Sequence, residues 1–344
     1  MIEPNVICPE CGGPIVKFYH TFWECDSCKE KFSCLHGIPK LFKEETVGKN
    51  DKKLRDHIYN SSLGKIYNFI MHLLMIPVRP VKVSRKHWLV YFIILFLLLF
   101  SIYQVVVWIA FRGIQTTQIS DIIFLVILAA FVLLFIKKPN YLSLMLFAVP
   151  VKISLSRKNF RPEKSHGAVH TEFQEEYKNS TRKLKILDVA TGSCNSLYRH
   201  GWMKLNADFT AVDLSEKMIL QGQELMSEKG VPVDFAICDA TRLPFESETF
   251  DIVTSYGAVN AYHDPKTALE EMVRVTRKGG KILFLDEQEY EGSNWFEHMY
   301  FKNVLTYHNT IVGCPVGLLP EEVEEVRVFQ VYEFIYVCVG RRGK

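Results

Sequence analysis

The sequence predicts an α/β fold built around a doubly wound, mostly parallel sheet in the C-terminal half of a 344-residue chain. From about residue 184 onward, apolar stretches of strand length alternate with helical stretches, as they do in parallel sheets with right-handed crossovers. The last two apolar stretches, 326–331 and 333–340, have almost no residues between them. Such a pair must be an antiparallel hairpin, because a parallel crossover needs a dozen residues or more.

Five parallel strands are predicted before this hairpin, so the sheet is expected to have seven strands. A helix after the second strand begins at Ser215, a favourable N-cap, and ends near Lys229 before Gly230. A later helix, 265–276, is followed by Lys278-Gly279-Gly280. The predicted parallel strands are 185–190, 208–213, 233–239, 250–256 and 281–286.

Two Cys-x-x-Cys pairs near the N-terminus are separated by 13 residues. Each pair can present two thiolates to one tetrahedral ion, and four cysteines in this arrangement are typical of structural Zn²⁺ sites. The first eleven residues lack the apolar segment of a cleavable signal peptide, which favours reduced cysteines over disulfides. The sequence therefore predicts a structural zinc site in residues 1–42, with ligands Cys8, Cys11, Cys25 and Cys28.

Cys34 and His36 are further candidate ligands, although a packed thiol is the simpler interpretation of Cys34 because four ligands are already present. The segment 8–41, which ends in His36-Gly37-Ile38-Pro39-Lys40-Leu41, resembles the zinc ribbon that precedes some methyltransferases, including bacterial ribosomal-RNA guanine methyltransferases. In those proteins too, the second cysteine pair is followed by an aromatic residue and then by Gly-Ile-Pro.

Two apolar runs occupy the middle of the chain. From 89 to 111, 21 of 23 residues are apolar, and from 122 to 136 all 15 are apolar. About 20 such residues span the hydrocarbon core of a bilayer, so the sequence predicts a transmembrane hairpin of helices 88–111 and 119–136. A helical hairpin buried in a soluble fold is the alternative, but its helices would keep a polar stripe, which neither run shows.

Basic residues flank these runs, whereas the loop between them contains only Arg112. The positive-inside rule then predicts an integral membrane protein with two spans, a lipid bilayer as partner, and both termini and the catalytic half in the cytoplasm. The expected organisation is a zinc ribbon (1–42), an amphipathic and basic linker (43–87), the hairpin (88–136), an interfacial basic linker (137–183) and the α/β domain (184–344).

A nucleotide-type cofactor is predicted by the run Ile186 to Asn195, an apolar strand that ends in Asp188 and opens through small residues into a helix. Small residues let a ligand approach the backbone, and the helix N-terminus offers free N–H groups. Asp213 ends the next strand, where a carboxylate can accept both hydroxyls of a ribose. These features fit any nucleoside-type cofactor, including NAD.

Two features favour S-adenosylmethionine (SAM) over NAD. The loop lacks the full Gly-x-Gly-x-x-Gly that a pyrophosphate requires, and the third strand ends in Cys238-Asp239-Ala240, with Leu243-Pro244-Phe245 soon after. Together with the terminal hairpin, these residues resemble a class I SAM-dependent methyltransferase, and most closely its ubiquinone/menaquinone and small-molecule subgroup. The resemblance covers about residues 184–341.

The resemblance implies a role for each motif residue. Asp188, Ala190 and Gly192 would line the methionine moiety. Asp213 would bind the ribose, and Asp239 and the Ala240 N–H would bind adenine. The remaining cofactor contacts implied are Leu214 and Met218 near adenine and Tyr256 beside the cofactor. Cys194 is bulkier than the residue that the family has at its position, which leaves open a weak or degenerate site.

Catalytic residues are not fixed by the sequence. Methyl transfer depends mainly on positioning, sometimes with a base for the nucleophile. Tyr256, His263 and Asp264 are weak candidates, and Asp264 before Pro265 is also a good helix N-cap. Aromatic residues between 290 and 308 could cover an apolar acceptor or pack in a core.

Three functions remain open. The first is methylation of a lipophilic small molecule, such as a quinone precursor, a lipid, or a hydrophobic thiol or phenol. The second is an RNA methyltransferase whose ribbon binds substrate. However, residues 184–344 contain 24 acidic and 16 basic residues, and nucleic-acid binding favours a basic surface. The third is a membrane scaffold with a vestigial, non-catalytic domain.

Overall fold

The computed structural model describes residues 6–61, 162–293, 298, 301–302, 306 and 309–344. The chain divides into two compact units. The first contains 1–67, 161–291 and 308–344 and carries every helix and strand discussed below. The second contains 68–160 and 292–307, of which few residues are described.

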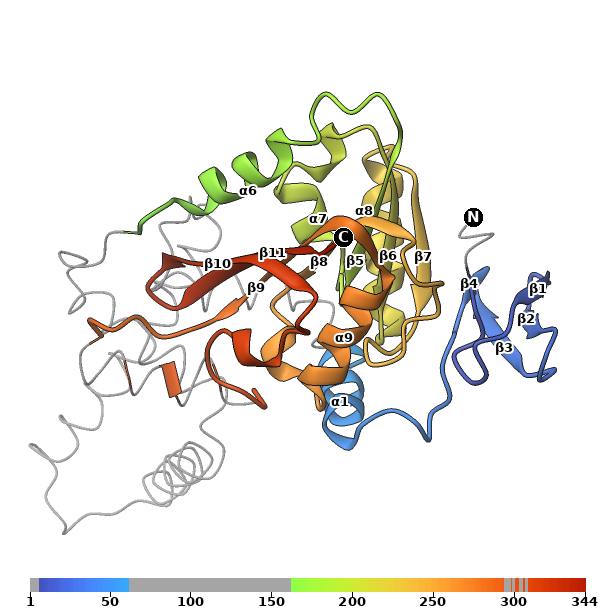
Figure 1. Cartoon of the computed structure of the whole chain (residues 1–344). Coiled ribbons are helices and arrows are strands. Elements are labelled where there is room, and N and C mark those ends of the chain that lie inside the picture. The colour runs from blue at the N-terminus through green and yellow to red at the C-terminus, as the bar shows by residue number, and fades with distance from the viewer. Residues whose placement is uncertain (1–5, 62–161, 294–297, 299–300, 303–305, 307–308) are drawn as a thin grey trace, which may run out of the picture. The chain divides into compact units, whose positions relative to one another are not determined.

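A seven-stranded sheet forms the centre of the first unit (Figure 1). Its order is β10-β11-β9-β8-β5-β6-β7. The central strands pair in parallel, and β11 pairs antiparallel with both β9 and β10. The seven predicted strands are therefore all present, at β5 (Leu184–Val189), β6 (Ala207–Asp213), β7 (Val233–Ile237), β8 (Phe250–Tyr256), β9 (Thr276–Glu287), β10 (Val323–Tyr332) and β11 (Ile335–Arg342).

Both faces of this sheet are buried, because successive side chains of each strand enter different cores. In β6, Val212 packs in one hydrophobic cluster and Ala211 in another. In β7, Ala236 belongs to the first cluster, and Phe235 and Ile237 belong to the second. The continuous apolar character of these strands follows from this arrangement.

Helices cover the two faces. α8 (Glu216–Glu228) packs against β6 and β7, and α9 (Pro265–Val275) packs against β8 and β9. Each helix begins where the sequence predicts, because the side chains of Ser215 and Asp264 accept the N–H groups of Met218 and Thr267. The shorter helical segments are α6 (His166–Glu175), α7 (Asn195–Arg199) and single turns at Trp202–Lys204, Val259–Ala261 and Val316–Leu318.

The largest departure from the predicted strands is at β9, which starts at Thr276 and not near Lys281. The register between β8 and β9 shifts between Phe250 and Ile252, so the two glycines that follow the predicted helix lie in a bulged part of the strand. A Cβ on Gly280 would lie 2.8 Å from the Arg277 carbonyl oxygen and 2.9 Å from that of Asp251. The close backbone approach therefore requires glycine there, and the bulge lets the strand continue.

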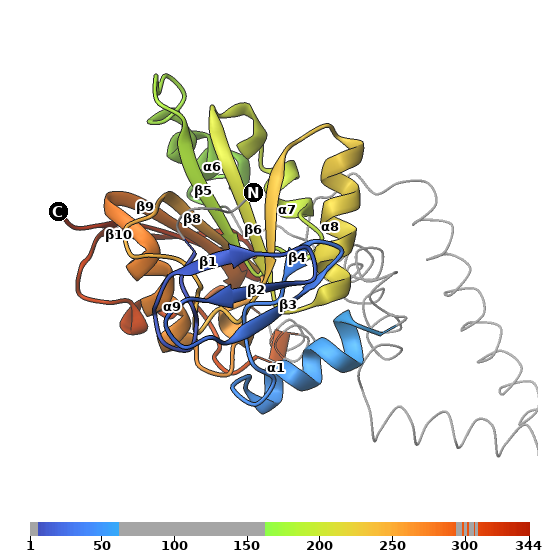
Figure 2. The same cartoon turned by 90° about the vertical axis from the view of Figure 1, so that its right-hand side faces the viewer.

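The N-terminal region folds as a four-stranded antiparallel sheet of β1 (Ile15–Phe18), β2 (Phe22–Cys25), β3 (Lys31–Leu35) and β4 (Ile38–Pro39). Figure 2 shows these strands in blue, and β4 contacts β7. Leu41 donates its N–H to the Ile237 carbonyl at 2.7 Å, and Lys40 forms a parallel bridge with Ile237. Before β1, the Ile7 N–H donates to the carbonyl of Pro244, which follows β7, at 3.1 Å.

This docking covers the outer edge of β7, which would otherwise expose unpaired backbone groups. Trp23, Phe32 and Leu41 join one core cluster of the seven-stranded sheet, and Ile38 and Phe42 join the other. The small N-terminal sheet therefore shares its hydrophobic core with the α/β domain.

After this sheet, the chain forms α1 (Lys49–Leu54) and one wider helical turn at Arg55–Tyr59. Arg55 is buried and pairs with Glu44 at 2.9 Å and Asp56 at 2.8 Å. The predicted linker at 43–87 therefore begins as ordered structure packed on the α/β domain, through contacts described below.

The predicted localisation, an integral membrane protein with two spans and cytoplasmic termini, is wrong for the part of the chain described here. None of its helices is both long and apolar enough to cross a bilayer. The runs that suggested the hairpin, 88–111 and 119–136, lie outside the described residues. The physical reason for the error is that apolar content alone cannot separate a membrane span from a segment buried in protein.

Candidate functional site

The loop after β5 holds alternate residues in the left-handed region, with φ of 54° at Ala190, 56° at Gly192 and 57° at Cys194. This conformation costs about 1–3 kcal/mol for a non-glycine residue and is typical of functional sites. A Cβ added to Gly192 would meet no heavy atom within 4 Å. The loop therefore leaves open space beside its backbone, where a ligand can approach.

Asp188 is fully buried at the carboxyl end of β5. One oxygen accepts the Thr191 hydroxyl at 2.6 Å, and the other accepts the Thr254 hydroxyl at 2.7 Å. Burial raises the pKa of Asp188 to about 6, although these two hydrogen bonds oppose the shift. Asp188 therefore ties the loop to β8, and its expected contact with a methionine moiety stays a prediction.

Asp213 lies at the carboxyl end of β6 and binds the same loop. Its Oδ2 accepts the Gly192 N–H at 2.8 Å, and its Oδ1 accepts the Ser215 N–H at 2.8 Å. Burial raises the pKa of Asp213 to about 6, and these backbone bonds oppose the shift. The structure thus brings together Gly192 and Asp213, the loop glycine and the second strand-end carboxylate that the sequence singled out.

Asp239 follows β7, the neighbour of β6 in the sheet. Its Oδ1 accepts both the N–H and the hydroxyl of Thr241, at 2.9 and 2.8 Å. The Cys238 N–H donates to the Asp213 carbonyl at 3.1 Å, so the two strand ends are adjacent. Among the other predicted contacts, Ala240 and Met218 are buried, and Leu214 is partly buried.

Cys194 does not block this space. Its side chain is fully buried, and its Sγ lies 3.0 Å from the position that a Cβ on Gly222 of α8 would occupy. The Thr191 hydroxyl lies 3.3 Å from the same sulfur. Gly222 therefore leaves room for the sulfur to pack against α8, and the effect of Cys194 on cofactor binding stays a prediction.

Tyr256 ends β8 and carries a hydroxyl with two neighbours from other elements. The Trp202 indole N–H donates to it at 2.7 Å, and the His170 Nε2 lies 3.2 Å away. Burial raises the pKa of Tyr256 well above its ordinary value. The hydroxyl is therefore neutral and fixed in position at neutral pH, and no local sequence pattern indicates either neighbour.

His263 and Asp264 follow β8 but have different surroundings. The His263 Nδ1 lies 2.5 Å from the Asp51 carboxylate, whose other oxygen accepts the His263 N–H at 3.2 Å. Asp264 caps α9, and its bonds to the Thr267 hydroxyl and N–H hold its pKa below the ordinary value. Asp264 is thus the predicted N-cap, and His263 binds α1.

Residues of the α1 region were missed by sequence analysis. Asp51 comes 212 residues before its partner His263, so no local spacing could reveal it. Asn60 accepts the Ser215 hydroxyl at 2.7 Å and the Lys217 N–H at 3.3 Å. The segment 48–60 is therefore bonded both to the start of α8, which follows Asp213, and to the loop after β8.

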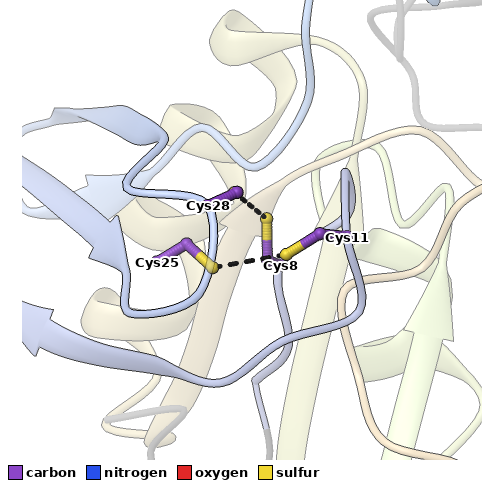
Figure 3. Close-up of side chains that lie close together, drawn as sticks. All are labelled: Cys8, Cys11, Cys25 and Cys28. Atoms are coloured by element: carbon purple, nitrogen blue, oxygen red, sulfur yellow. Dashed lines mark hydrogen bonds between the residues drawn. The ribbon is translucent and has the colours of Figure 1, made fainter.

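The four predicted zinc ligands lie close together, with their sulfur atoms facing one another (Figure 3). The Cys8 and Cys28 sulfurs are 3.7 Å apart, and those of Cys11 and Cys25 are 3.5 Å apart. Tetrahedral zinc with Zn–S bonds of about 2.3 Å separates its sulfurs by about 3.8 Å. The cluster thus has dimensions that suit one such ion.

Backbone N–H groups support two of these sulfurs, from Glu10 to Cys8 and from Gly13 to Cys11, both at 3.4 Å. Neither Cys34 nor His36 belongs to the cluster. Cys34 is partly buried, and burial raises its pKa. His36 is exposed.

The aromatic segment is only partly described. Phe301 is buried, and Tyr290 packs edge-on against Phe334 with ring centroids 6.4 Å apart. The other aromatic residues from 294 to 308 lie outside the described residues, so their role as a substrate cover stays a prediction.

Comparison with known proteins covers the same part of the chain. Residues 187–284 match the family model described as "Methyltransferase domain". The chain is 37% identical over 106 residues to the ubiquinone/menaquinone biosynthesis C-methyltransferase UbiE of Bordetella parapertussis, covering 30% of this chain and 40% of that protein. It is 30% identical over 164 residues to the UbiE of Cereibacter sphaeroides, covering 46% and 65%. This chain therefore spans less than two thirds of each relative.

Solved structures align with this chain only weakly. Phosphoethanolamine N-methyltransferase 2 of Haemonchus contortus, solved with SAM, aligns at 15% identity with a TM-score of 0.42, covering 51% of this chain and 52% of that one. Agreement at this level carries no functional argument.

Proposed function

We propose that this protein, whose residues 187–284 form a SAM-dependent methyltransferase domain, transfers the methyl group of SAM to a lipophilic small molecule. The acceptor class comprises quinone precursors, lipids, and hydrophobic thiols or phenols. One observation carries the cofactor assignment. The Asp213 carboxylate accepts the Gly192 N–H at 2.8 Å, and the loop that contains Gly192 has open space at that residue.

Each strand end supplies one part of the cofactor site in this proposal. Asp213 uses one lone pair of each carboxylate oxygen for a backbone N–H, so a second lone pair on each remains for the ribose hydroxyls. Asp239 accepts Thr241 through Oδ1 alone, which leaves Oδ2 for the adenine amine, and Ala240 offers its N–H. The loop at Ala190 and Gly192 borders the methionine moiety.

When bound, SAM supplies a methyl group on a positively charged sulfonium. Such a displacement depends on holding the acceptor in line and keeping water out. Asp188 and Asp213 place two carboxylates near the cationic ligand, and the Asp188 bonds to Thr191 and Thr254 fix the loop that borders it. Tyr256, held by the Trp202 indole, offers a neutral hydroxyl at the edge of the same site.

Two observations support a lipophilic acceptor over RNA. The relatives in the comparison are named as ubiquinone/menaquinone C-methyltransferases, and the acidic balance of residues 184–344 opposes binding to a phosphate backbone. The N-terminal sheet also uses its edge to dock on β7. We assign the cysteine cluster one structural Zn²⁺, because two of its sulfur pairs lie 3.7 and 3.5 Å apart and all four sulfurs lie within 4.8 Å of one another.

A labelled transfer assay tests the acceptor class. Purified protein is mixed with SAM carrying a tritiated methyl group and a cell lysate, which is then separated into organic extract, RNA and protein. Label in the organic extract is expected. Label in RNA would favour the ribbon-guided RNA enzyme, and no transfer by protein that binds SAM would favour a non-catalytic scaffold.

Calorimetric titration with SAM tests the cofactor site separately. Asp213→Ala removes the carboxylate assigned to the ribose and should weaken binding about 10- to 100-fold, the range for losing hydrogen bonds to a charged group. Asp208→Ala is the matched control, because Asp208 is exposed at the opposite end of β6 and pairs with Lys183. Equal loss in both variants would contradict the assignment.

A further inference from the structure

A second cluster of metal-ligating side chains lies apart from the cysteines. His166 and His170 are four residues apart on α6, and His200 follows α7. One ring nitrogen from each histidine lies within 4.8 Å of the other two. The ring centroids are 4.4 to 4.7 Å apart in all three pairs. Three imidazoles, two from α6 and one from the residue after α7, therefore lie together, with the His170 and His200 rings stacked.

The tautomer of His170 suits metal binding. Its Nδ1 lies 3.0 Å from the His166 carbonyl oxygen, and a carbonyl can only accept, so Nδ1 carries the proton. Nε2 then carries the lone pair, which faces the Tyr256 hydroxyl at 3.2 Å, so a bound ion would replace that hydrogen bond. Histidine ligands in proteins usually donate their second ring nitrogen in this way, which fixes both the ring and its tautomer.

We propose that His166, His170 and His200 bind one divalent transition-metal ion beside Tyr256, at the carboxyl edge of the seven-stranded sheet. Neutral imidazoles suit Zn²⁺ and its neighbours in the first transition row. Zn–N bonds of about 2.0–2.1 Å place tetrahedral ligand atoms about 3.4 Å apart. The nitrogens, now within 4.8 Å, would reach that spacing by side-chain rotation.

Tyr256 connects this site with the methyltransferase edge. Its ring stacks on that of His200 with centroids 4.5 Å apart, and its hydroxyl lies 3.2 Å from His170 Nε2. Three protein ligands leave a fourth position for water or substrate, as in catalytic zinc sites. On the proposed function, that position takes a hydroxyl or carbonyl oxygen of the methyl acceptor, which the ion polarises.

Metal counting on the full-length protein tests the proposal. The protein is stripped of metal and dialysed against Zn²⁺, and bound zinc is measured by atomic spectroscopy. His166→Gln and His200→Gln should each bind one equivalent fewer than the wild type. Both positions are only partly buried, so both variants should fold. His36→Gln is the control, because that exposed histidine lies outside both clusters and should leave the count unchanged.

Cobalt distinguishes the two clusters. Co²⁺ bound by the cysteines gives an intense thiolate charge-transfer band, whereas a histidine site gives only weak visible bands. The weak bands should disappear in His200→Gln while the thiolate band stays. A wild-type spectrum with thiolate features alone, or equal zinc counts in wild type and both variants, would overturn the site.

SAM titration of the same preparations separates this proposal from the proposed function. Loss of zinc in the variants with SAM binding intact supports the metal site and keeps the cofactor assignment. Normal zinc counts without SAM binding in any preparation would instead overturn the proposed function alone.

Discussion

The N-terminal four-stranded sheet and the carboxyl edge of the seven-stranded sheet are held in place by opposite means. In the first, four cysteines lie within 21 residues of sequence and bring their sulfurs together around one point. Its apolar residues then complete both cores of the α/β domain at the β7 edge. Metal binding by the cysteines and burial of these apolar residues would both lower the free energy of the folded state.

At the carboxyl edge, several features raise the free energy of the folded state. Asp188 and Asp213 are carboxylates whose pKa values burial raises to about 6. Ala190 and Cys194 occupy the left-handed region without being glycine. Such strain persists only where surrounding structure holds it, and it concentrates where ligands bind. The contrast shows that the small sheet stabilises a domain whose functional edge is intrinsically costly.

Breaking the cysteine cluster should have the largest effect. Cys25→Ser removes one of four ligands, and because Trp23 and Phe32 share a core with the α/β domain, the whole unit should lose about 4 kcal/mol or more of stability. The unfolding midpoint should fall by about 10 °C. Cys34→Ser, outside the cluster, is the control in the same thermal scan. A midpoint unchanged by Cys25→Ser would show that the ribbon contributes nothing to the domain.

Gly222→Ala should destabilise the carboxyl edge of the seven-stranded sheet by disturbing its contact with α8. The new Cβ would lie 3.0 Å from the Cys194 sulfur and 3.4 Å from the Phe235 ring. This overpacking should lower the free energy of unfolding by about 2 kcal/mol. Denaturant unfolding measures this loss. The double variant Gly222→Ala with Cys194→Ala should recover most of it, because the two sites are coupled. Simple additivity of the two substitutions would show that Cys194 packs elsewhere.

Asp188→Asn should stabilise the fold while it weakens the cofactor site. A carboxyl whose pKa is raised on folding contributes stability at low pH, and that contribution is lost as the pH rises through about 6. At pH 8 the ionised Asp188 is therefore unfavourable. Asparagine removes the charge, and its side-chain amide can still form hydrogen bonds with the Thr191 and Thr254 hydroxyls. The free energy of unfolding at pH 8 should therefore rise by about 1 kcal/mol.

The same variant should bind SAM less tightly, because one carboxylate near the cationic ligand is gone. Chemical unfolding and calorimetry on one preparation measure both effects. A variant that loses stability together with affinity would show that Asp188 is a structural residue and not a strained functional one.

The pH dependence of SAM binding should be confined to acidic conditions. In the free protein Asp213 becomes protonated as the pH falls through about 6, whereas the bound cation favours the ionised form. Affinity should therefore be constant above pH 7 and fall by up to about tenfold for each pH unit below 6. Asp213→Asn should flatten this dependence. Constant wild-type affinity from pH 8 to pH 5 would show that Asp213 stays ionised without the cofactor.

Local patterns were sufficient for much of the fold and part of the site. The grouping of the four cysteines could be predicted because their spacing places all four on two adjacent turns. Asp188, Asp213 and Asp239 could be predicted because each ends an apolar run, and parallel strands bring their carboxyl ends to one edge. Ser215 and Asp264 are recognisable helix caps for the same local reason.

Contacts between distant segments could not be predicted in this way. The docking of Leu41 on Ile237, the pairing of Asp51 with His263, and the meeting of His170 with Tyr256 join residues between 86 and 212 positions apart. Sequence periodicity reports the environment of one element and carries no information about which other element packs on it. Hydropathy also suggested a transmembrane hairpin, and the described helices include no membrane span.

Sequence therefore decided the order of strands and helices, the cysteine cluster and the strand-end acids, because each depends on neighbours within one element or one turn. The tertiary structure alone decided that the N-terminal sheet closes the β7 edge, that Gly222 makes room for Cys194, and that three histidines lie together beside Tyr256. Those outcomes depend on how whole elements pack, and packing is settled by shape and burial across the entire unit.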